Sequence, residues 1–138
     1  MSLDHEDFAA AVRISSLTPV YEAKKIRVAG HLQSCDLDHS MIVIEDQDTP
    51  LLVDISLCIN GRASCPWLRE RNTTVVAVGY LDVIDMTLED NTEPIPTLIL
   101  HALVINERRD LDLDVWNSAI DAYEQAKSKL EPTSVNSQ

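Results

Sequence analysis

The sequence contains no apolar run that approaches the roughly 20 residues needed to cross a bilayer. Its opening segment, MSLDHED, is acidic and lacks both the basic segment and the apolar stretch of a secretory signal. We therefore expect neither a membrane-spanning nor an exported protein. The 138 residues leave room for one domain, and 45% hydrophobic with 25% charged residues are typical of a globular one.

Cysteine is also scarce. The sequence has three cysteines, Cys35, Cys58 and Cys65, and no CxxC pair. This odd number favours free thiols in a reducing compartment over a disulfide framework or a zinc knuckle. The motifs GxGxxG, GxxxxGK followed by Ser or Thr, HExxH and GxSxG are absent as well. The sequence therefore predicts a protein that is not an enzyme and that uses no cofactor and no metal.

Positive charge is limited to 11 Lys and Arg residues against 23 Asp and Glu, which gives a formal net charge of −12. Nucleic-acid affinity depends largely on neutralising phosphates, so this chain alone should bind DNA weakly unless its cations are clustered. Cations gather modestly in two places that could form one patch, although they could equally serve only to solubilise the surface. Trp67 could stack on bases or pack in the core. The candidate nucleic-acid-binding residues are Lys25, Arg27, Arg62, Trp67, Arg69 and Arg71.

Residues 31–39 gather two histidines, a cysteine and two aspartates, and residues 38–40 have the side-chain types of a hydrolytic triad. Sequential neighbours on a strand point to opposite faces, so they do not converge as a triad does. We therefore interpret this segment as a polar hairpin turn. Metal ligation by His31 with His39 is the weaker alternative.

Five segments have the patterns of β-strands, with apolar and polar side chains alternating or with short apolar runs between polar turns. Gly30 lies within the first segment, where a bulge or tight bend would fit. Pro66 breaks the pattern between the third and fourth segments, and a short helical turn could follow it. An acidic loop over residues 85–96 precedes the fifth segment. The predicted strands are 26–32, 41–44, 51–59, 73–84 and 97–105.

A helix is predicted over residues 113–130, with aspartates before it and lysines near its end, as the helix dipole favours. It carries two apolar seams, which together are wider than one contact surface requires. One seam should cover the protein's own barrel, and the alanine-rich seam should admit a partner helix. The predicted partner-interface residues are Val115, Trp116, Ala119, Ile120, Ala122, Tyr123 and Ala126.

Five strands, a break after the third and a terminal helix predict an all-β barrel with helices, namely a five-stranded oligonucleotide/oligosaccharide-binding (OB) fold with a C-terminal α-helix. An SH3-type barrel is less favoured because these strands are long and the helix is substantial. The expected organisation is an N-terminal tail over 1–13, the OB domain over 14–130, and a C-terminal tail over 131–138.

The stretch 14–124 resembles the TEN-one family, the smallest subunit of the telomere-capping CST complex. The segments that carry the resemblance are 26–32, 52–57, 76–81 and 111–120. It implies a non-catalytic subunit in the nucleus, at the telomeric region of chromosomes, that heterodimerises with a larger OB-fold partner, STN-one, and regulates telomere replication. A third subunit and single-stranded telomeric DNA, held mainly by the partner, are further implied associations.

Two alternatives remain open. The small subunit of replication protein A is similar for the same reasons, and it implies a general complex that binds single-stranded DNA. A small barrel enzyme or ligand-binding protein that uses the turn at residues 36–39 is the alternative of a different class. Nothing in the sequence shows the partner's identity or the preferred DNA sequence.

Overall fold

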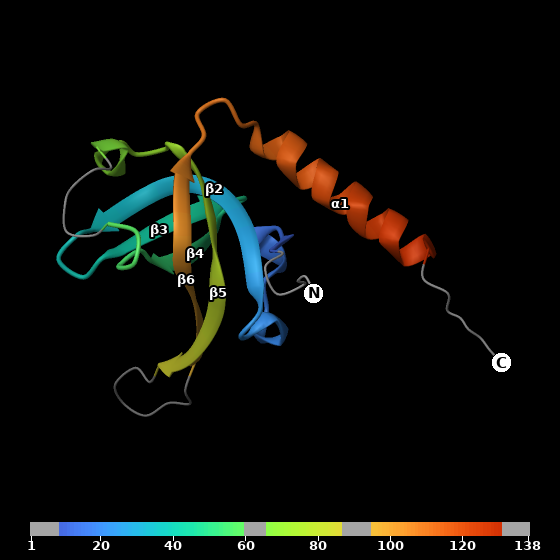
Figure 1. Ribbon diagram of the computed structural model, residues 1–138, viewed down its shortest axis with the longest axis horizontal. Coiled ribbons are helices and arrows are strands. Elements are labelled where there is room, and N and C mark those ends of the chain that lie inside the picture. The colour runs from blue at the N-terminus through green and yellow to red at the C-terminus, as the bar shows by residue number, and fades with distance from the viewer. Residues whose placement is uncertain (1–8, 60–65, 87–94, 131–138) are drawn as a thin grey trace, which may run out of the picture.

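The computed structural model describes residues 9–59, 66–86 and 95–130 (Figure 1). The described chain forms one mixed sheet in the order β1-β2-β3-β4-β6-β5, in which β2 also pairs with β5. β2 to β6 make a closed five-stranded barrel with one terminal helix, which confirms the predicted OB fold. The strands are β1 (Ala10–Ala11), β2 (Lys25–Asp36), β3 (Met41–Asp46), β4 (Thr49–Asp54), β5 (Thr74–Met86) and β6 (Ile95–Glu107).

β2 belongs to two ladders and therefore bends. Its first half pairs antiparallel with β5, from Lys25 to His31, and its second half pairs antiparallel with β3, from His31 to Asp36. Gly30 lies next to the switch between the two ladders. A Cβ atom there would lie 3.0 Å from the Glu45 carbonyl oxygen, so a glycine lets β2 and β3 approach closely.

The barrel closes along a short parallel seam between β4 and β6, where Leu52 to Asp54 pair with Ile99 to His101. Side chains that alternate along the strands fill the interior, as the predicted period-2 patterns require. The largest fully buried side chains are Ile26, Leu32, Ile42, Ile44, Ile55, Leu81, Leu100, Val28, Val53 and Val75.

Three short 3-10 turns complete the barrel: η2 (Ile14–Ser16), η3 (Pro19–Tyr21) and η4 (Pro66–Arg69). η4 occupies the predicted helical turn after Pro66, and Trp67 packs against the core from it.

β2, β3, β5 and β6 each extend two to four residues beyond the predicted C-terminal end of the strand, and β6 also begins two residues earlier than predicted. Two further differences have a local cause. β4 ends at Asp54, whereas the sequence predicted a strand to residue 59, because the Asp54 carboxylate accepts the Ser56 N–H at 2.9 Å and turns the chain out of the ladder. Residues 10 and 11, assigned to the N-terminal tail, instead pair in parallel with β2. Their short strand was missed because two alanines carry no alternating pattern.

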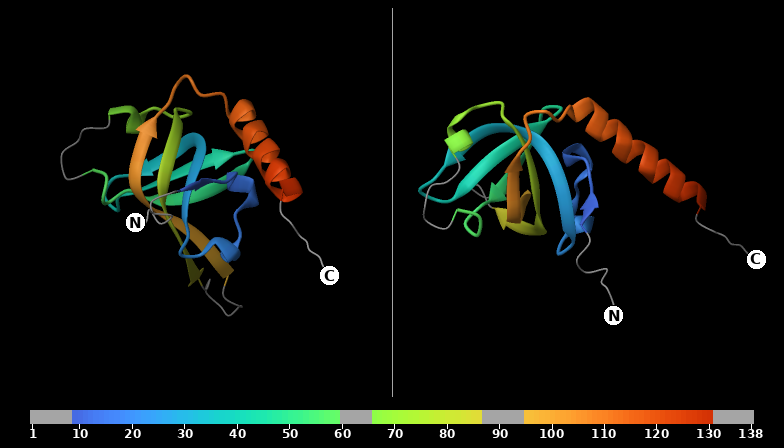
Figure 2. Two further views of the ribbon diagram at one scale, coloured as in Figure 1. Left: turned by 45° about the vertical axis from the view of Figure 1, so that its right-hand side comes forward. Right: turned by 45° about the horizontal axis from the view of Figure 1, so that its top comes forward.

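The helix α1 (Leu113–Leu130) has the bounds predicted for it. The Asp112 carboxylate caps its N-terminus by accepting the N–H of Asp114 at 2.9 Å, and Lys127 and Lys129 lie in its last turn. α1 extends past the barrel along much of its length (Figures 1 and 2). No helix of the described residues is long and apolar enough to cross a membrane.

A buried polar pair holds α1 on the barrel. The Asn117 amide Nδ2 donates to the Asp46 carboxylate at 2.8 Å, and these residues are 5% and 6% exposed. Arg13 reinforces the attachment with an ion pair to Asp121 at 2.7 Å and a hydrogen bond to Gln47 at 2.7 Å. A buried carboxylate without a donor is costly, so α1 is fixed at one position along β3.

We expect Asn117→Ala to lower the free energy of unfolding by about 1.5 to 3 kcal/mol, because it leaves the Asp46 carboxylate buried without its donor. Urea denaturation measures this effect. The double variant Asp46→Ala/Asn117→Ala should lose less than the sum of the two single variants, whereas the exposed Asn106→Ala control should change stability by less than about 0.5 kcal/mol. Additive losses at Asp46 and Asn117 would show that the pair is not coupled.

Candidate functional site

The N-terminal half of α1 covers a small apolar cluster on the outer side of the barrel. Ala29 on β2, Val76 on β5 and Leu113 form this cluster, and Leu111 and Trp116 pack against it. Ile120 is also buried, so the barrel uses one side of the helix, as the two-seam pattern predicted.

The other apolar side of α1 is open to solvent in this chain. Val115 is 62% exposed and Tyr123 is 60% exposed, and the three alanines of the second seam, Ala119, Ala122 and Ala126, are exposed. Of the predicted interface residues, Ile120 is buried and Trp116 is partly buried against the barrel, because both lie on the side of the helix that faces β2 and β5. The remaining five form one open surface.

A cleft of about 320 Å³ lies between this side of α1 and the paired strands β1 and β2. Apolar side chains line most of it, together with three charged residues. The lining residues are Ala10, Ala11, Arg27, Trp116, Ala119, Ile120, Tyr123, Glu124 and Lys127.

Two N–H groups beside this cleft are buried without an acceptor among the described residues: the Trp116 indole Nε1 and the Arg27 guanidinium Nε. The Arg27 Nη2 donates to the Ala9 carbonyl at 3.1 Å, which holds the guanidinium against β1. An unsatisfied buried donor costs about 1 to 3 kcal/mol. Both nitrogens are shielded from solvent, so this cost bears on the packing between α1 and β2.

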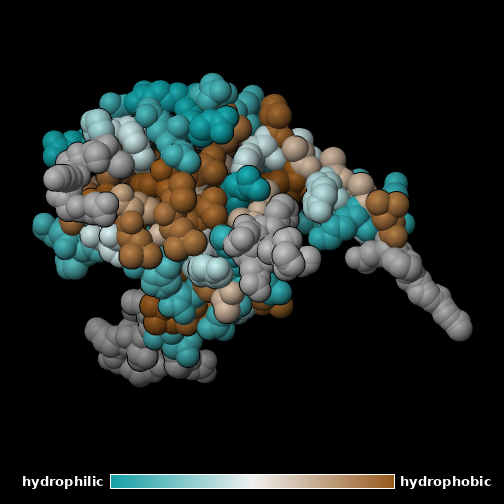
Figure 3. Space-filling model, viewed as in Figure 1, coloured by the Kyte–Doolittle hydropathy of each residue, from teal (hydrophilic) through white to brown (hydrophobic). Residues whose placement is uncertain are grey.

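Apolar residues extend beyond α1 onto the barrel. Figure 3 shows them, in brown, gathered on the face of the barrel seen in that view. Val104 on β6 pairs with Val78 on β5, two residues from the cluster that α1 covers, and Val104 and Leu103 are exposed. The open apolar surface therefore continues from the base of α1 onto β5 and β6.

The candidate nucleic-acid residues do not gather in one patch. Lys25 and Arg27 lie on the first half of β2, where they pair with Tyr80 and Val78 of β5. Arg69 and Arg71 line a different cleft, at the η4 end of the barrel. Because β2 is long, about 16 Å of strand separates Arg27 from the start of that second cleft.

Two further candidates, Trp67 and Arg62, remain. The Trp67 side chain packs against the core, as expected if it serves packing and not base stacking. Arg62 lies outside the described residues.

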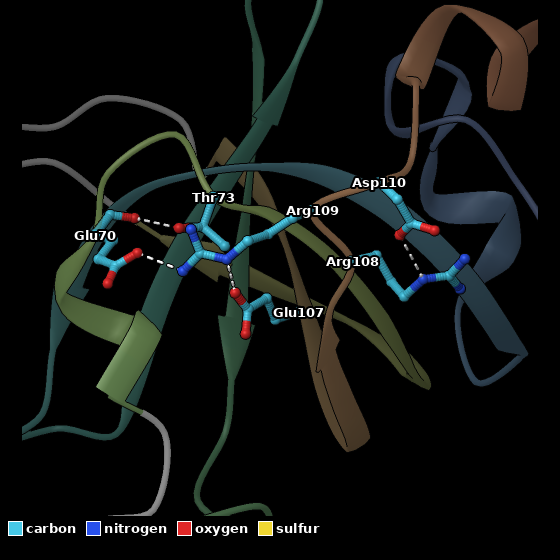
Figure 4. Close-up of polar contacts among 6 residues, drawn as sticks. All are labelled: Glu70, Thr73, Glu107, Arg108, Arg109 and Asp110. Atoms are coloured by element: carbon cyan, nitrogen blue, oxygen red, sulfur yellow. Dashed lines mark hydrogen bonds and ion pairs between the residues drawn. The ribbon is translucent and has the colours of Figure 1, made fainter.

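Other cations are held by neighbouring carboxylates (Figure 4). The Arg109 guanidinium lies between Glu107 and Glu70, with its Nη2 at 2.5 Å from the Glu70 carboxylate, and Arg108 contacts Asp110 at 3.4 Å. The Thr73 hydroxyl donates to the Glu70 carbonyl at 2.7 Å. This network ties the segment after η4 to the end of β6, and it occupies cations that could otherwise bind phosphates.

The segment predicted as a polar hairpin turn is a turn between β2 and β3. The His39 Nδ1 lies 2.8 Å from the Asp36 carboxylate, both exposed, while the His31 Nδ1 lies 3.3 Å from the Thr74 hydroxyl in another part of the sheet. In the described part of the chain, no group of three or more His, Cys, Asp or Glu side chains is placed to hold a metal ion.

Sequence reasoning missed a polar cluster on the closing seam of the barrel. The His101 ring lies between two carboxylates, with Nδ1 at 3.0 Å from Asp54 on β4 and Nε2 at 3.0 Å from Asp82 on β5. Only an imidazolium can donate from both ring nitrogens, so this geometry favours the protonated ring. Asp54, Asp82 and His101 are far apart in the sequence, and only the sheet register brings them together.

The pKa values of His101 and Asp54 both differ from their ordinary values. Hydrogen bonding to Asp82, and then to Asp54, raises the pKa of His101 against the opposing effect of burial. Burial raises the pKa of Asp54, but the hydrogen bonds from Ser56 and His101 outweigh it and hold that pKa below its usual value.

These two pKa shifts predict a pH range in which the cluster stabilises the seam. The raised His101 pKa contributes stability that is complete below its unfolded value of 6.5 and is lost as pH rises through the folded value. The lowered Asp54 pKa contributes stability above 3.8 that is lost as pH falls. Urea denaturation across pH 4 to 8 should therefore show a stability gain near pH 5 to 6 that His101→Gln removes and His31→Gln retains. A pH profile unchanged by His101→Gln would contradict this assignment.

The comparisons with known proteins show a likeness of fold. No protein-family model and no curated protein matches the sequence. A chain of the Stn1–Ten1 complex of S. pombe has a similar structure, with a TM-score of 0.62, 14% identity, and coverage of 86% of this chain and 94% of that one. Telomere capping protein Ten1 from Saccharomyces pombe matches with a TM-score of 0.60, 14% identity, and coverage of 86% and 99%.

Replication protein A of U. maydis, solved with single-stranded DNA, contains a chain that matches with a TM-score of 0.57 and 12% identity, over 90% of this chain and 96% of that one. At these identities the likeness concerns the fold. The chain has an OB fold like that of Ten1, the TEN-one protein of S. pombe, and like that of a replication protein A subunit.

Proposed function

We propose that the chain is a non-catalytic OB-fold subunit that heterodimerises through α1 with a larger OB-fold protein. The observation that carries this proposal is the open apolar side of α1 beside the cleft on β1 and β2. A solvent-exposed stripe of this kind is a liability in a lone monomer, and a partner helix would cover it. The alanines of the stripe let that helix approach closely.

The cleft also indicates what the partner presents there. Its apolar lining favours a large apolar side chain of the partner. The exposed apolar residues on β5 and β6 favour a contact that continues from α1 onto the barrel. The likeness to a structure of a Stn1–Ten1 complex supports a larger OB-fold partner.

We further propose that the heterodimer binds and protects single-stranded telomeric DNA in the nucleus, with a third subunit as a further partner, and thereby regulates telomere replication. The likeness to a telomere capping protein supports the telomeric role. A general replication role is the second candidate, because replication protein A bound to single-stranded DNA matches over a larger share of this chain. Preference of the heterodimer for a telomeric repeat over an equally long mixed sequence distinguishes the two roles.

The partner test compares Ala119→Glu and Ala122→Glu with Ser128→Glu. The first two variants place a carboxylate on the open side of α1. Ser128 points to the opposite side of the helix from Ala119 and does not line the cleft. Co-purification with a co-expressed Stn1-like partner should fall at least about tenfold for the first two variants, because an unpaired charge would be buried. Ser128→Glu should bind normally.

Thermal melting of the isolated chain provides the matched control, since all three positions are exposed and all three variants should fold. If Ala119→Glu and Ala122→Glu kept full partner binding, or if they unfolded the isolated chain while Ser128→Glu did not, the open side of α1 would not be the interface.

The second test concerns DNA. The isolated chain should bind single-stranded DNA only weakly, with a Kd of about 10⁻⁴ M or above at physiological salt, because its net charge is −12 and its cations are dispersed or paired. Fluorescence anisotropy with a labelled telomeric oligonucleotide measures this affinity for the chain and for the co-purified heterodimer. Tight binding by the chain alone would contradict the proposal that the partner holds most of the DNA.

A further inference from the structure

A second cleft, of about 520 Å³, lies at the η4 end of the barrel. The residues that line it include the five consecutive residues 32–36 of β2, together with the start of the following turn and the η4 segment. Side chains of a strand alternate between its two faces, so a cleft over one face would be lined by every second residue. This cleft therefore runs along the edge of β2.

Among the described residues, no strand pairs with β2 on that edge beyond Leu32. Residues 34–36 pair with β3 on one side. On the other side, the last backbone hydrogen bonds run from the Leu32 N–H to the Thr73 carbonyl, at 2.8 Å, and from the Asn72 N–H to the Leu32 carbonyl, at 2.7 Å. Beyond them the chain turns away into η4, and no described strand takes the vacated place in the sheet.

The two ends of the cleft differ in charge. Arg69 and Arg71 lie where the chain leaves the sheet, both are exposed, and within residues 9–59, 66–86 and 95–130 neither guanidinium has an ion pair. At the opposite end, Asp36 is engaged by His39, and Asp38 faces the cleft without an ion pair in the same residues. The buried side chains of Leu32 and Leu68 contribute an apolar lining between the two ends.

We propose that this cleft binds an extended peptide segment of a partner protein, which adds a strand to β2. The open backbone edge supplies main-chain hydrogen bonds, as in other cases of strand addition. A carboxylate of the peptide lies toward Arg69 and Arg71, where charge-assisted hydrogen bonds are strong. An apolar side chain contacts Leu32 and Leu68, and a basic group lies toward Asp38.

This site is separate from the α1 surface. The two clefts share no lining residue, and η4 and α1 lie on opposite sides of the barrel in each view (Figures 1 and 2). The peptide site therefore does not depend on the heterodimer proposed above, and both surfaces can be occupied at once.

The test uses the full chain and two fluorescein-labelled peptides, Glu-Val-Thr-Val-Lys and its reverse Lys-Val-Thr-Val-Glu, because the structure permits either strand direction. We expect one of them to bind saturably in fluorescence anisotropy and to slow hydrogen exchange of amides in residues 33–36. The double variant Arg69→Glu/Arg71→Glu should weaken binding about tenfold or more, since hydrogen bonds between charged groups are lost. A peptide N-methylated at its central residues keeps its side chains but loses main-chain donors, so it should bind at least about tenfold more weakly.

Arg108→Glu is the matched control, because it reverses an exposed arginine away from this cleft and should leave peptide binding unchanged. Thermal melting verifies that each variant is folded. The proposal would be overturned if neither peptide bound saturably up to about 1 mM. It would also be overturned if binding did not change on N-methylation of the peptide or in the Arg69→Glu/Arg71→Glu variant. If no peptide bound but an oligonucleotide bound the chain and lost affinity in the double variant, the two arginines would contact nucleic acid instead.

Discussion

The shared strand β2 is the constraint on which the rest of the structure depends. It pairs with β5, with β3 and with β1, and α1 packs on its outer side at Ala29. A strand in two ladders must bend, and Gly30 removes the side chain that would block the bend. Because its partners change along its length, β2 forms a wall of both clefts at opposite ends.

Barrel closure is a second, smaller constraint, because β4 and β6 pair over only three residues each. The close approach of β5 and β6 supports this seam. A Cβ on Gly79 would lie 2.1 Å from the His101 carbonyl oxygen, so only glycine permits that crossing. The same crossing places the His101 side chain between carboxylates from both neighbouring strands. Polar contacts thus secure a seam that has few backbone hydrogen bonds.

The OB fold and the bounds of α1 could be predicted because their signals are local: period-2 alternation along each strand, aspartates before the helix and two apolar seams along it. Features that depend on the register between strands could not be predicted from the sequence. Asp46 and Asn117 meet across 71 residues, and the Asp54–His101–Asp82 cluster needs three strands in place. Periodicity likewise identified two apolar seams on α1 but did not show which of their residues face the barrel, where Ile120 is buried.

Several arginines of this acidic chain are engaged in contacts within the chain itself. Arg109, Arg13 and Arg108 are paired with carboxylates and hold structural elements together. Arg27 fixes β1 against β2 through the Ala9 carbonyl. Cations used in this way add little to a phosphate-binding field. The chain's surfaces are instead an apolar helix side and an open strand edge, which suit protein partners. Under the function proposed above, the chain would contact other proteins through these surfaces, and the DNA affinity would reside mainly in those proteins.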